Sequence, residues 1–246
     1  MPIKPILKIP KDISSFVNNK GLQQVIADYK KSSSSTGCES IDYASLYINI
    51  RNNKFKSILE CGSGVSTVVM AYALYENYKD TKVKGFINSM EEIPEYHKMS
   101  ISNTPEFLKP YINYILSPCS YDHYSIFTGR KYDAIHLVDY DFCFIDGPNF
   151  EIDRGRHCFC FDLVNVLLNT TTNPVCAFID GRFSTIYVMM KLLGNSKVSV
   201  YKKDKQTIIG IVQPSLKSDI RIKSKSNFRE LLKIDTDDND VITFND

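Results

Sequence analysis

From residue 57 onward, short apolar segments alternate with stretches of helical period. The apolar segments are typical of strands buried in a sheet, and the stretches between them suit helices that connect one strand to the next. A strand, a helix and a second strand in this order form a right-handed unit in which the two strands run parallel. We expect such strands at residues 57–61, 83–89, 111–117, 142–146 and 175–180.

The last two apolar segments, 197–201 and 207–212, break this pattern because only five residues separate them. Five residues are too few for the crossover that parallel strands need, so these two strands must form an antiparallel hairpin. The sequence therefore predicts an α/β protein: a three-layer sandwich around a mostly parallel seven-stranded sheet that ends in an antiparallel hairpin.

Three regions follow from this pattern. Residues 1–52 are predicted to form an N-terminal helical extension that caps a cofactor or mediates the contacts of a homodimer, because apolar residues at 22, 25, 26 and 29 share one helix face. Residues 53–216 hold the predicted sheet, and residues 217–246 form a charged C-terminal tail.

Composition limits the classes of partner. The chain carries 30 basic and 28 acidic residues, a net charge of +2 that gives no electrostatic argument for a nucleic-acid binder. No apolar run approaches the ~20 residues that span a bilayer, and the N-terminus lacks the apolar core of a signal peptide. The seven cysteines are scattered, without a metal-binding spacing. We therefore expect a reduced cytoplasmic protein with no membrane partner.

The most informative motif is a pair of glycines between the strand at 57–61 and the helix expected after it. Gly62 and Gly64 let the backbone turn sharply and approach a ligand closely, and the helix that follows presents free N–H groups to that ligand. Thr67 stands where a dinucleotide-binding fold has its third glycine. Glu60 would repel a diphosphate but suits a cationic group. Thr67 and Glu60 thus both differ from the pattern of a dinucleotide-binding fold, which argues against NAD as the ligand.

These residues resemble the first motif of the class I S-adenosylmethionine-dependent methyltransferases, an acidic residue followed by Gly-x-Gly. The resemblance covers about residues 50–214, including the order of the elements and the terminal hairpin. It implies S-adenosylmethionine as the cofactor and Glu91, after the second strand, as the acid that accepts from the ribose hydroxyls, with Glu92 as the alternative. The adenine pocket falls after the third strand. The implied cofactor-binding residues are Glu60, Gly62, Ser63, Gly64, Ser66, Thr67, Glu91, Cys119 and Ser120.

Two expected strands end in the same Asp-Gly pair, at Asp146 and Asp180. Each pair alone suits a simple turn, but two on neighbouring parallel strands place both carboxylates at the edge of the sheet where ligands bind. The resemblance implies that Asp146 faces the methyl donor and the acceptor, where it can accept a proton from an acceptor hydroxyl or amine.

In the metal-dependent O-methyltransferases of this class, acids at these two places hold Mg²⁺, which gives Asp146 and Asp180 a second interpretation. The third oxygen ligand usually follows the second acid, but Gly181 and Arg182 stand there, and an arginine beside a divalent cation is unfavourable. We therefore expect a metal-free general base and assign Asp180 to acceptor binding.

A polar loop after Asp146 completes the predicted acceptor site. Asn149, Arg154 and Arg182 can bind a carboxylate, a phosphate or sugar hydroxyls, although surface solvation explains each arginine equally well. His157 is a second candidate base because its ordinary pKa lies near neutrality. Six tyrosines could line this site or simply belong to the core: Tyr111, Tyr114, Tyr121, Tyr124, Tyr132 and Tyr140.

The sequence thus predicts methyl transfer to a hydroxyl or amine of a small molecule or sugar. Two other interpretations remain open at this point. A nucleotide-binding oxidoreductase is disfavoured by Glu60 and Thr67, and a methyltransferase-like binding protein without catalysis is disfavoured by the retained motif.

Overall fold

The computed structural model describes residues 6–33, 39–152, 156–170, 172–202 and 208–222. Its main sheet has seven strands in the order β11-β12-β10-β6-β1-β2-β3. The pairs among β10, β6, β1, β2 and β3 are parallel, whereas β12 runs antiparallel to both β10 and β11. The predicted sheet and its terminal hairpin are therefore confirmed. The strands are β1 (Ser57–Cys61), β2 (Phe86–Glu91), β3 (Ile112–Leu116), β6 (Phe142–Ile145), β10 (Val175–Asp180), β11 (Val198–Lys202) and β12 (Ile208–Ser215).

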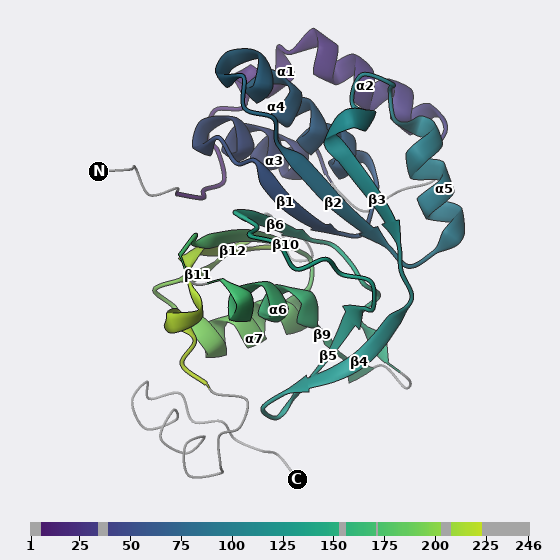
Figure 1. Cartoon of the computed structure of the whole chain (residues 1–246). Coiled ribbons are helices and arrows are strands. Elements are labelled where there is room, and N and C mark those ends of the chain that lie inside the picture. Colours follow the sequence, from purple (N-terminus) through teal and green to yellow (C-terminus); the bar gives the residue numbers. More distant parts are fainter. Residues whose placement is uncertain (1–5, 34–38, 153–155, 171, 203–207, 223–246) are drawn as a thin grey trace.

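Helices cover both faces of this sheet, which gives the three layers that the sequence predicts (Figure 1). One face carries α1 (Ser14–Val17), α2 (Lys20–Lys31), α3 (Ser40–Asn53), α4 (Val65–Thr81) and α5 (Pro94–Asn103). The other face carries α6 (Phe161–Asn169) and α7 (Phe183–Leu193). None of the described helices is both long enough and apolar enough to cross a membrane.

Alternation along β1 divides the core between these two faces. Ile58 belongs to the apolar cluster under α2, α3 and α4, while Leu59 and Cys61 belong to the cluster under α6 and α7. Successive side chains of a strand point to opposite faces, so Glu60 lies on the same face as Ile58. This alternation decides where the acidic residue of the glycine motif lies.

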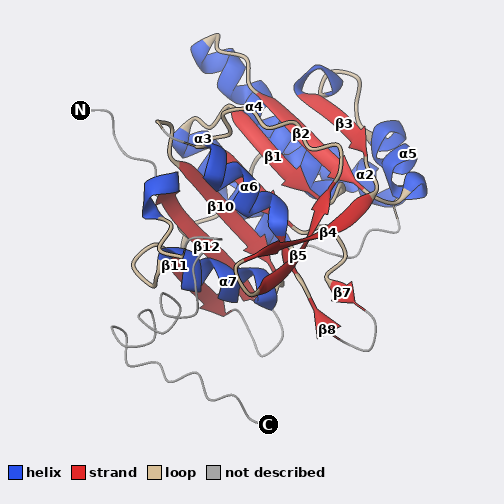
Figure 2. Cartoon of the chain, turned by 60° about the horizontal axis from the view of Figure 1, so that its bottom comes forward, coloured by secondary structure: helices blue, strands red, loops and turns tan. Residues whose placement is uncertain are grey.

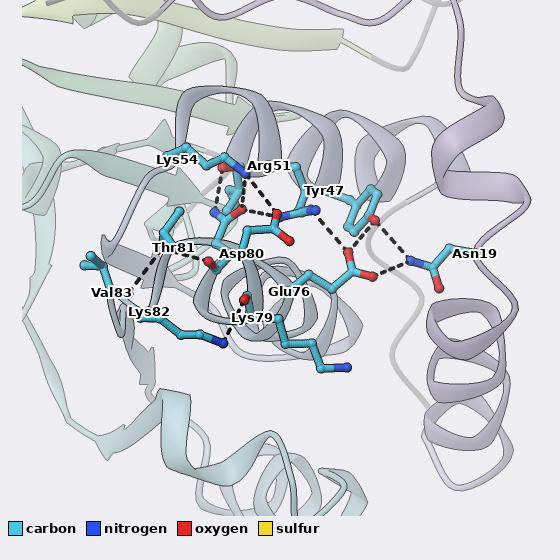
Figure 3. Close-up of polar contacts among 12 residues, drawn as sticks. Asn19, Tyr47, Arg51, Lys54, Glu76, Lys79, Asp80, Thr81, Lys82 and Val83 are labelled. Carbon is cyan, nitrogen blue, oxygen red and sulfur yellow. Dashed lines mark hydrogen bonds and ion pairs between the residues drawn. The ribbon is translucent and has the colours of Figure 1, made fainter.

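The described part of the N-terminal extension shares the core of the sheet. Leu22 and Tyr29 of α2 are buried in the same apolar cluster as Ile58. Figure 3 shows the polar network that joins α2 and α3 to α4. The amide of Asn19 donates to the hydroxyl of Tyr47 and to the carboxylate of Glu76, each at 3.0 Å. The extension is therefore packed on the domain through both apolar and polar contacts.

Between β3 and β6 the chain forms a hairpin that sequence analysis missed, β4 (Cys119–Tyr124) and β5 (Phe127–Tyr132). The short strand β9 (Phe159–Cys160) pairs with β5 in parallel, so this hairpin belongs to a second, three-stranded sheet. A further two-stranded sheet, β7 (Glu151–Ile152) with β8 (Arg156–His157), projects from the domain in Figure 2. Cys119 and Ser120 therefore lie on a strand, not in a loop after β3.

Several boundaries differ from the predicted ones, and β12 runs to Ser215, three residues further than expected. β2 begins at Phe86, not at residue 83, because Val83 is 52% exposed and lies outside the ladder. At the other end, the short 3₁₀ helix η3 (Lys217–Asp219) and the buried residue Ile222 still pack on the domain, and the hydroxyl of Tyr124 donates to the Ile222 carbonyl at 2.8 Å. The rest of the predicted tail lies outside the described residues.

Candidate cofactor and acceptor site

A cavity of about 360 Å³ lies at the carboxyl ends of β1, β2 and β6. This is the edge of a parallel sheet at which ligands usually bind, and the volume lies within the range of small-molecule pockets. Three of the predicted acids and glycines, Gly62, Glu91 and Asp146, line the same space. The lining residues are Gly62, Ser63, Glu91, Glu92, Ile93, Tyr96, Met99, Tyr132, Asp146, Gly147, Asn149, Phe150 and Arg182.

Two glycines face each other where the turns after β1 and β6 meet. Gly62 has a φ of +94°, and a Cβ added to it would lie 3.1 Å from the backbone of Asp146. A Cβ added to Gly147 would lie 2.7 Å from the Gly62 nitrogen and 2.5 Å from the Tyr132 hydroxyl. Such distances exclude a side chain at either position without movement of the turns. Glycine at position 147 is therefore required by close packing against the glycine turn.

Glu60 does not line the cavity. It is fully buried and accepts hydrogen bonds from the hydroxyls of Ser66, Thr67 and Ser89, each at 2.6 Å. Burial raises the pKa of Glu60 to about 7 despite these three donors. The Thr67 hydroxyl also accepts from the backbone N–H of Gly64 at 3.0 Å. The sequence predicts that Glu60 contacts a cationic group directly, but the structure places its side chain elsewhere. The alternation of β1 turns Glu60 toward α4, where its hydrogen bonds fix the glycine turn.

Glu91 lies at the end of β2 with its carboxylate against the glycine turn. One oxygen accepts from the backbone N–H and the hydroxyl of Ser63, at 3.1 and 2.9 Å. The other accepts from the N–H groups of Glu92 and Ile93, at 2.9 and 3.0 Å. A carboxylate has about four acceptor positions, so a ribose diol would have to replace one of these donors. The Ser63 hydroxyl can turn away because the Ser100 hydroxyl lies 2.9 Å from it.

The same Ser100 links the glycine turn to the N-terminal extension. The hydroxyl of Tyr29, on α2, donates to the Ser100 oxygen at 3.1 Å, and Tyr29 is buried. A chain of hydroxyl groups therefore runs from α2 through α5 to Ser63 and the Glu91 carboxylate.

Glu92 joins three elements across the mouth of the cavity. Its carboxylate accepts from the backbone N–H of Asn149 at 2.7 Å and forms an ion pair with Arg130 of β5 at 2.7 Å. Arg130 also donates to the Asn149 carbonyl at 3.1 Å. Asn149 thus lies at the cavity, as predicted for an acceptor-binding residue, whereas sequence analysis missed Arg130 because it missed the hairpin that carries it.

Asp146 follows β6, and its side chain is 32% exposed at the cavity. Arg182 donates to the carbonyl oxygens of Asp146 and Pro148, and its guanidinium lies 3.6 Å from the Asp146 carboxylate. The Arg182 Nε is buried without a hydrogen-bond partner among the described residues. Asp180 ends β10, which pairs with β6, so the two acids end adjacent strands. Of this pair, only Asp146 lines the cavity.

The remaining predicted residues lie away from the cavity or outside the described residues. His157 is exposed on β8, with its ring 4.9 Å from that of Phe150. Cys119 and Ser120 are half-buried on β4 and are not among the lining residues. Arg154 lies outside the described residues. The roles of these four residues stay predictions.

Beneath the cavity floor, Cys61, Cys160 and Asp162 form the one group of three candidate metal ligands within the described part of the chain. All three are buried. One Asp162 oxygen accepts from the backbone N–H of Tyr132 at 3.1 Å, and the other has no partner among the residues that the structure describes. Burial raises the pKa of Asp162 to about 7.

These raised pKa values predict that the protein is more stable in mild acid than in mild base. A carboxyl whose pKa is higher in the folded than in the unfolded state stabilises the fold fully below the unfolded pKa near 4, and this contribution is lost as the pH rises through about 7. We expect the free energy of unfolding, measured by denaturant titration, to fall by roughly 1–3 kcal/mol between pH 5.5 and 8.5.

Asp162→Asn should lose less stability over this pH range than the wild-type protein, because the variant lacks one of the carboxyls whose raised pKa lies in this range. Asp28→Asn is the matched control, since Asp28 lies on the surface. Equal pH dependence in the wild-type protein and the Asp162 variant would contradict the assignment to Asp162.

No family model matches the sequence, and no curated protein is similar to it at a significant level. The structure, however, resembles that of the O-methyltransferase TomG from Streptomyces achromogenes, which is involved in tomaymycin synthesis and was crystallised with S-adenosylmethionine. The TM-score is 0.52 at 13% identity over 82% of this chain and 93% of that one.

Two further structures resemble this one at lower scores. The S-adenosylhomocysteine-bound methyltransferase PaMTH1 from Podospora anserina gives a TM-score of 0.50 at 15% identity, over 85% of this chain and 99% of that one. A putative caffeoyl-CoA O-methyltransferase from Staphylococcus aureus gives 0.50 at 12% identity, over 82% and 98%. At such identities the likeness establishes the fold: the chain has the Rossmann-like fold of the class I S-adenosylmethionine-dependent methyltransferases.

Proposed function

We propose that this protein transfers the methyl group of S-adenosylmethionine to a hydroxyl or amine of a small molecule or sugar. The observation that carries the proposal is the cavity at the carboxyl ends of β1, β2 and β6, which has Glu91 on one side and Asp146 on the other. The three solved structures named above support the proposal through their fold and their bound or named chemistry.

The residues of the cavity fit this cofactor. Gly62 and Gly147 let the turns after β1 and β6 pack directly against each other, and both line the cavity, so a ligand bound there would lie close to the backbone. Ser63 and Glu91 offer a hydroxyl and a carboxylate at the end of β2, where the ribose would lie once the Ser63 hydroxyl turns to Ser100. When bound, S-adenosylmethionine supplies a methyl group on a positively charged sulfur.

Asp146 is the general base in this proposal. Its carboxylate is the part of the cavity that can accept the proton released when an acceptor oxygen or nitrogen forms its bond to the methyl carbon. Arg182 holds the Asp146 backbone through its carbonyl, so the carboxylate is presented in a fixed position.

Calorimetric titration with S-adenosylmethionine, S-adenosylhomocysteine and NAD tests the cofactor. We expect both sulfur compounds to bind and NAD to give no response. Transfer of a radiolabelled methyl group to a panel of sugars, phenols and amines then tests the activity. Tight binding of NAD without any response to the sulfur compounds would overturn the proposal, and cofactor binding without transfer to any acceptor would favour a binding protein.

The mechanism with Mg²⁺ held by Asp146 and Asp180 predicts a different response to chelation. We expect EDTA to leave turnover unchanged, because the Arg182 guanidinium lies 3.6 Å from the Asp146 carboxylate, where a second cation would be repelled. From the acceptor-binding role assigned to Asp180 in the sequence, we expect Asp180→Asn to raise mainly the KM of the acceptor, although Asp180 is not among the residues that line the cavity. Turnover is measured with and without EDTA, and again after Mg²⁺ is added. Activity that EDTA abolishes and Mg²⁺ restores would show the metal-dependent mechanism.

A further inference from the structure

Tyr132, the last residue of β5, places a phenol hydroxyl at the floor of the cavity. The side chain is buried, with 1% of the residue exposed, and it is one of the lining residues. A Cβ built on Gly147 would lie 2.5 Å from the Tyr132 oxygen and 2.7 Å from the Gly62 nitrogen. The hydroxyl therefore lies where the turns after β1 and β6 meet.

This hydroxyl differs from those of Tyr124 and Tyr140, because no described residue forms a hydrogen bond with it. The Tyr140 hydroxyl donates to the His136 carbonyl at 2.6 Å and accepts from the Asn88 amide at 2.8 Å. The Tyr124 hydroxyl donates to the carbonyl of Ile222. Buried polar groups nearly always have a partner, so an unpaired one that opens into a cavity indicates that a ligand supplies the partner.

The position of Tyr132 is fixed on both sides. Its backbone N–H donates to the buried carboxyl of Asp162, and its strand pairs with Cys119 of β4. Burial raises the pKa of Tyr132 well above its ordinary value, so the hydroxyl keeps its proton and acts as a neutral donor. A fixed donor of this kind needs no reorganisation when a ligand binds.

We infer that the Tyr132 hydroxyl binds the methionyl half of the cofactor and donates a hydrogen bond to its carboxylate. This inference rests on the proposed function. With the ribose at Glu91 and the methyl group near Asp146, this inference places the methionyl half over the floor between Gly62 and Gly147, which is where the hydroxyl lies. A carboxylate is the strongest hydrogen-bond acceptor in that half of the molecule.

Tyr132→Phe tests the inference by removing one oxygen atom. We expect the Kd of S-adenosylhomocysteine to rise about 10- to 100-fold, the usual effect of losing a hydrogen bond to a charged group. The Ki of methylthioadenosine, which lacks the amino-acid half, should stay at the wild-type value when measured by displacement. The melting temperature should not fall, because the hydroxyl has no partner among the described residues.

Tyr140→Phe is the matched control. It removes a buried hydroxyl that has two protein partners and lies outside the cavity lining, so it should lower the melting temperature and leave the affinity for S-adenosylhomocysteine unchanged. Wild-type affinity for S-adenosylhomocysteine in Tyr132→Phe, or an equal loss for methylthioadenosine, would overturn the inference. A failure of the proposed function would give a different result, because the wild-type protein would then bind neither S-adenosylhomocysteine nor methylthioadenosine.

Discussion

Replacing Asp146 with asparagine is expected to lower turnover by about 10²–10⁴-fold while S-adenosylhomocysteine binds nearly as in the wild-type protein. The substitution keeps the shape of the side chain and removes its capacity to accept a proton. The Arg182 hydrogen bond goes to the Asp146 carbonyl, which the substitution leaves in place. Steady-state kinetics gives kcat, and calorimetry gives the Kd of the cofactor product.

Asp180→Asn is the comparison variant because it neutralises the acid at the end of the adjacent strand. Its kcat should stay within a few-fold of the wild-type value, so that a large loss in the Asp146 variant alone identifies the base. If the Asp146 variant keeps the wild-type kcat, another group accepts the proton of the methyl acceptor. His157→Gln would then examine the second predicted base.

Replacing Gly62 with alanine should weaken S-adenosylhomocysteine binding by 100-fold or more and lower the free energy of unfolding by about 1–3 kcal/mol. Two effects add at this position. The φ of +94° is strained for any residue with a side chain, and the new Cβ would lie 3.1 Å from the Asp146 backbone. Relief of this crowding moves apart the two turns that form the cavity floor. Calorimetry and denaturant titration measure the two losses.

Gly181→Ala separates the two causes. Gly181 also has a positive φ, +60°, but a Cβ there would have no atom within 4 Å. It should therefore lose about 1 kcal/mol of stability through backbone strain and keep its affinity for the cofactor product. An unchanged Kd in the Gly62 variant would show that the turn after β1 has a structural role only.

The sheet could be predicted from the sequence because its signals are local. Apolar segments bounded by turns mark the strands, and the five residues between the last two strands exclude a crossover. Reliance on local apolar pattern also explains why the start of β2 was predicted three residues too early. Val83 belongs to the apolar pattern, but its side chain lies in solvent.

Only those residues of the site that belong to a recognisable sequence motif, such as the glycine turn or a strand that ends in an acid, could be predicted. Gly62, Glu91 and Asp146 line one cavity, as expected, but the orientation of Glu60 depends on how α4 packs against β1. Arg130 was missed, and Tyr132 was one of six candidates, because β4 and β5 lack a strong apolar alternation. The second sheet that holds them also includes β9, which pairs with β5 from further along the chain.

The hydroxyl chain from Tyr29 to Ser63 has a consequence for how cofactor affinity can change. If the ribose of the proposed cofactor replaces the Ser63 hydroxyl at the Glu91 carboxylate, that hydroxyl turns to Ser100. Because Ser100 is held by a tyrosine of the N-terminal extension, a substitution on α2 alters the free energy of that exchange without touching the ligand. In the proposed function, cofactor affinity would thus be adjustable from a helix of the N-terminal extension, while the glycine turn itself stays unchanged.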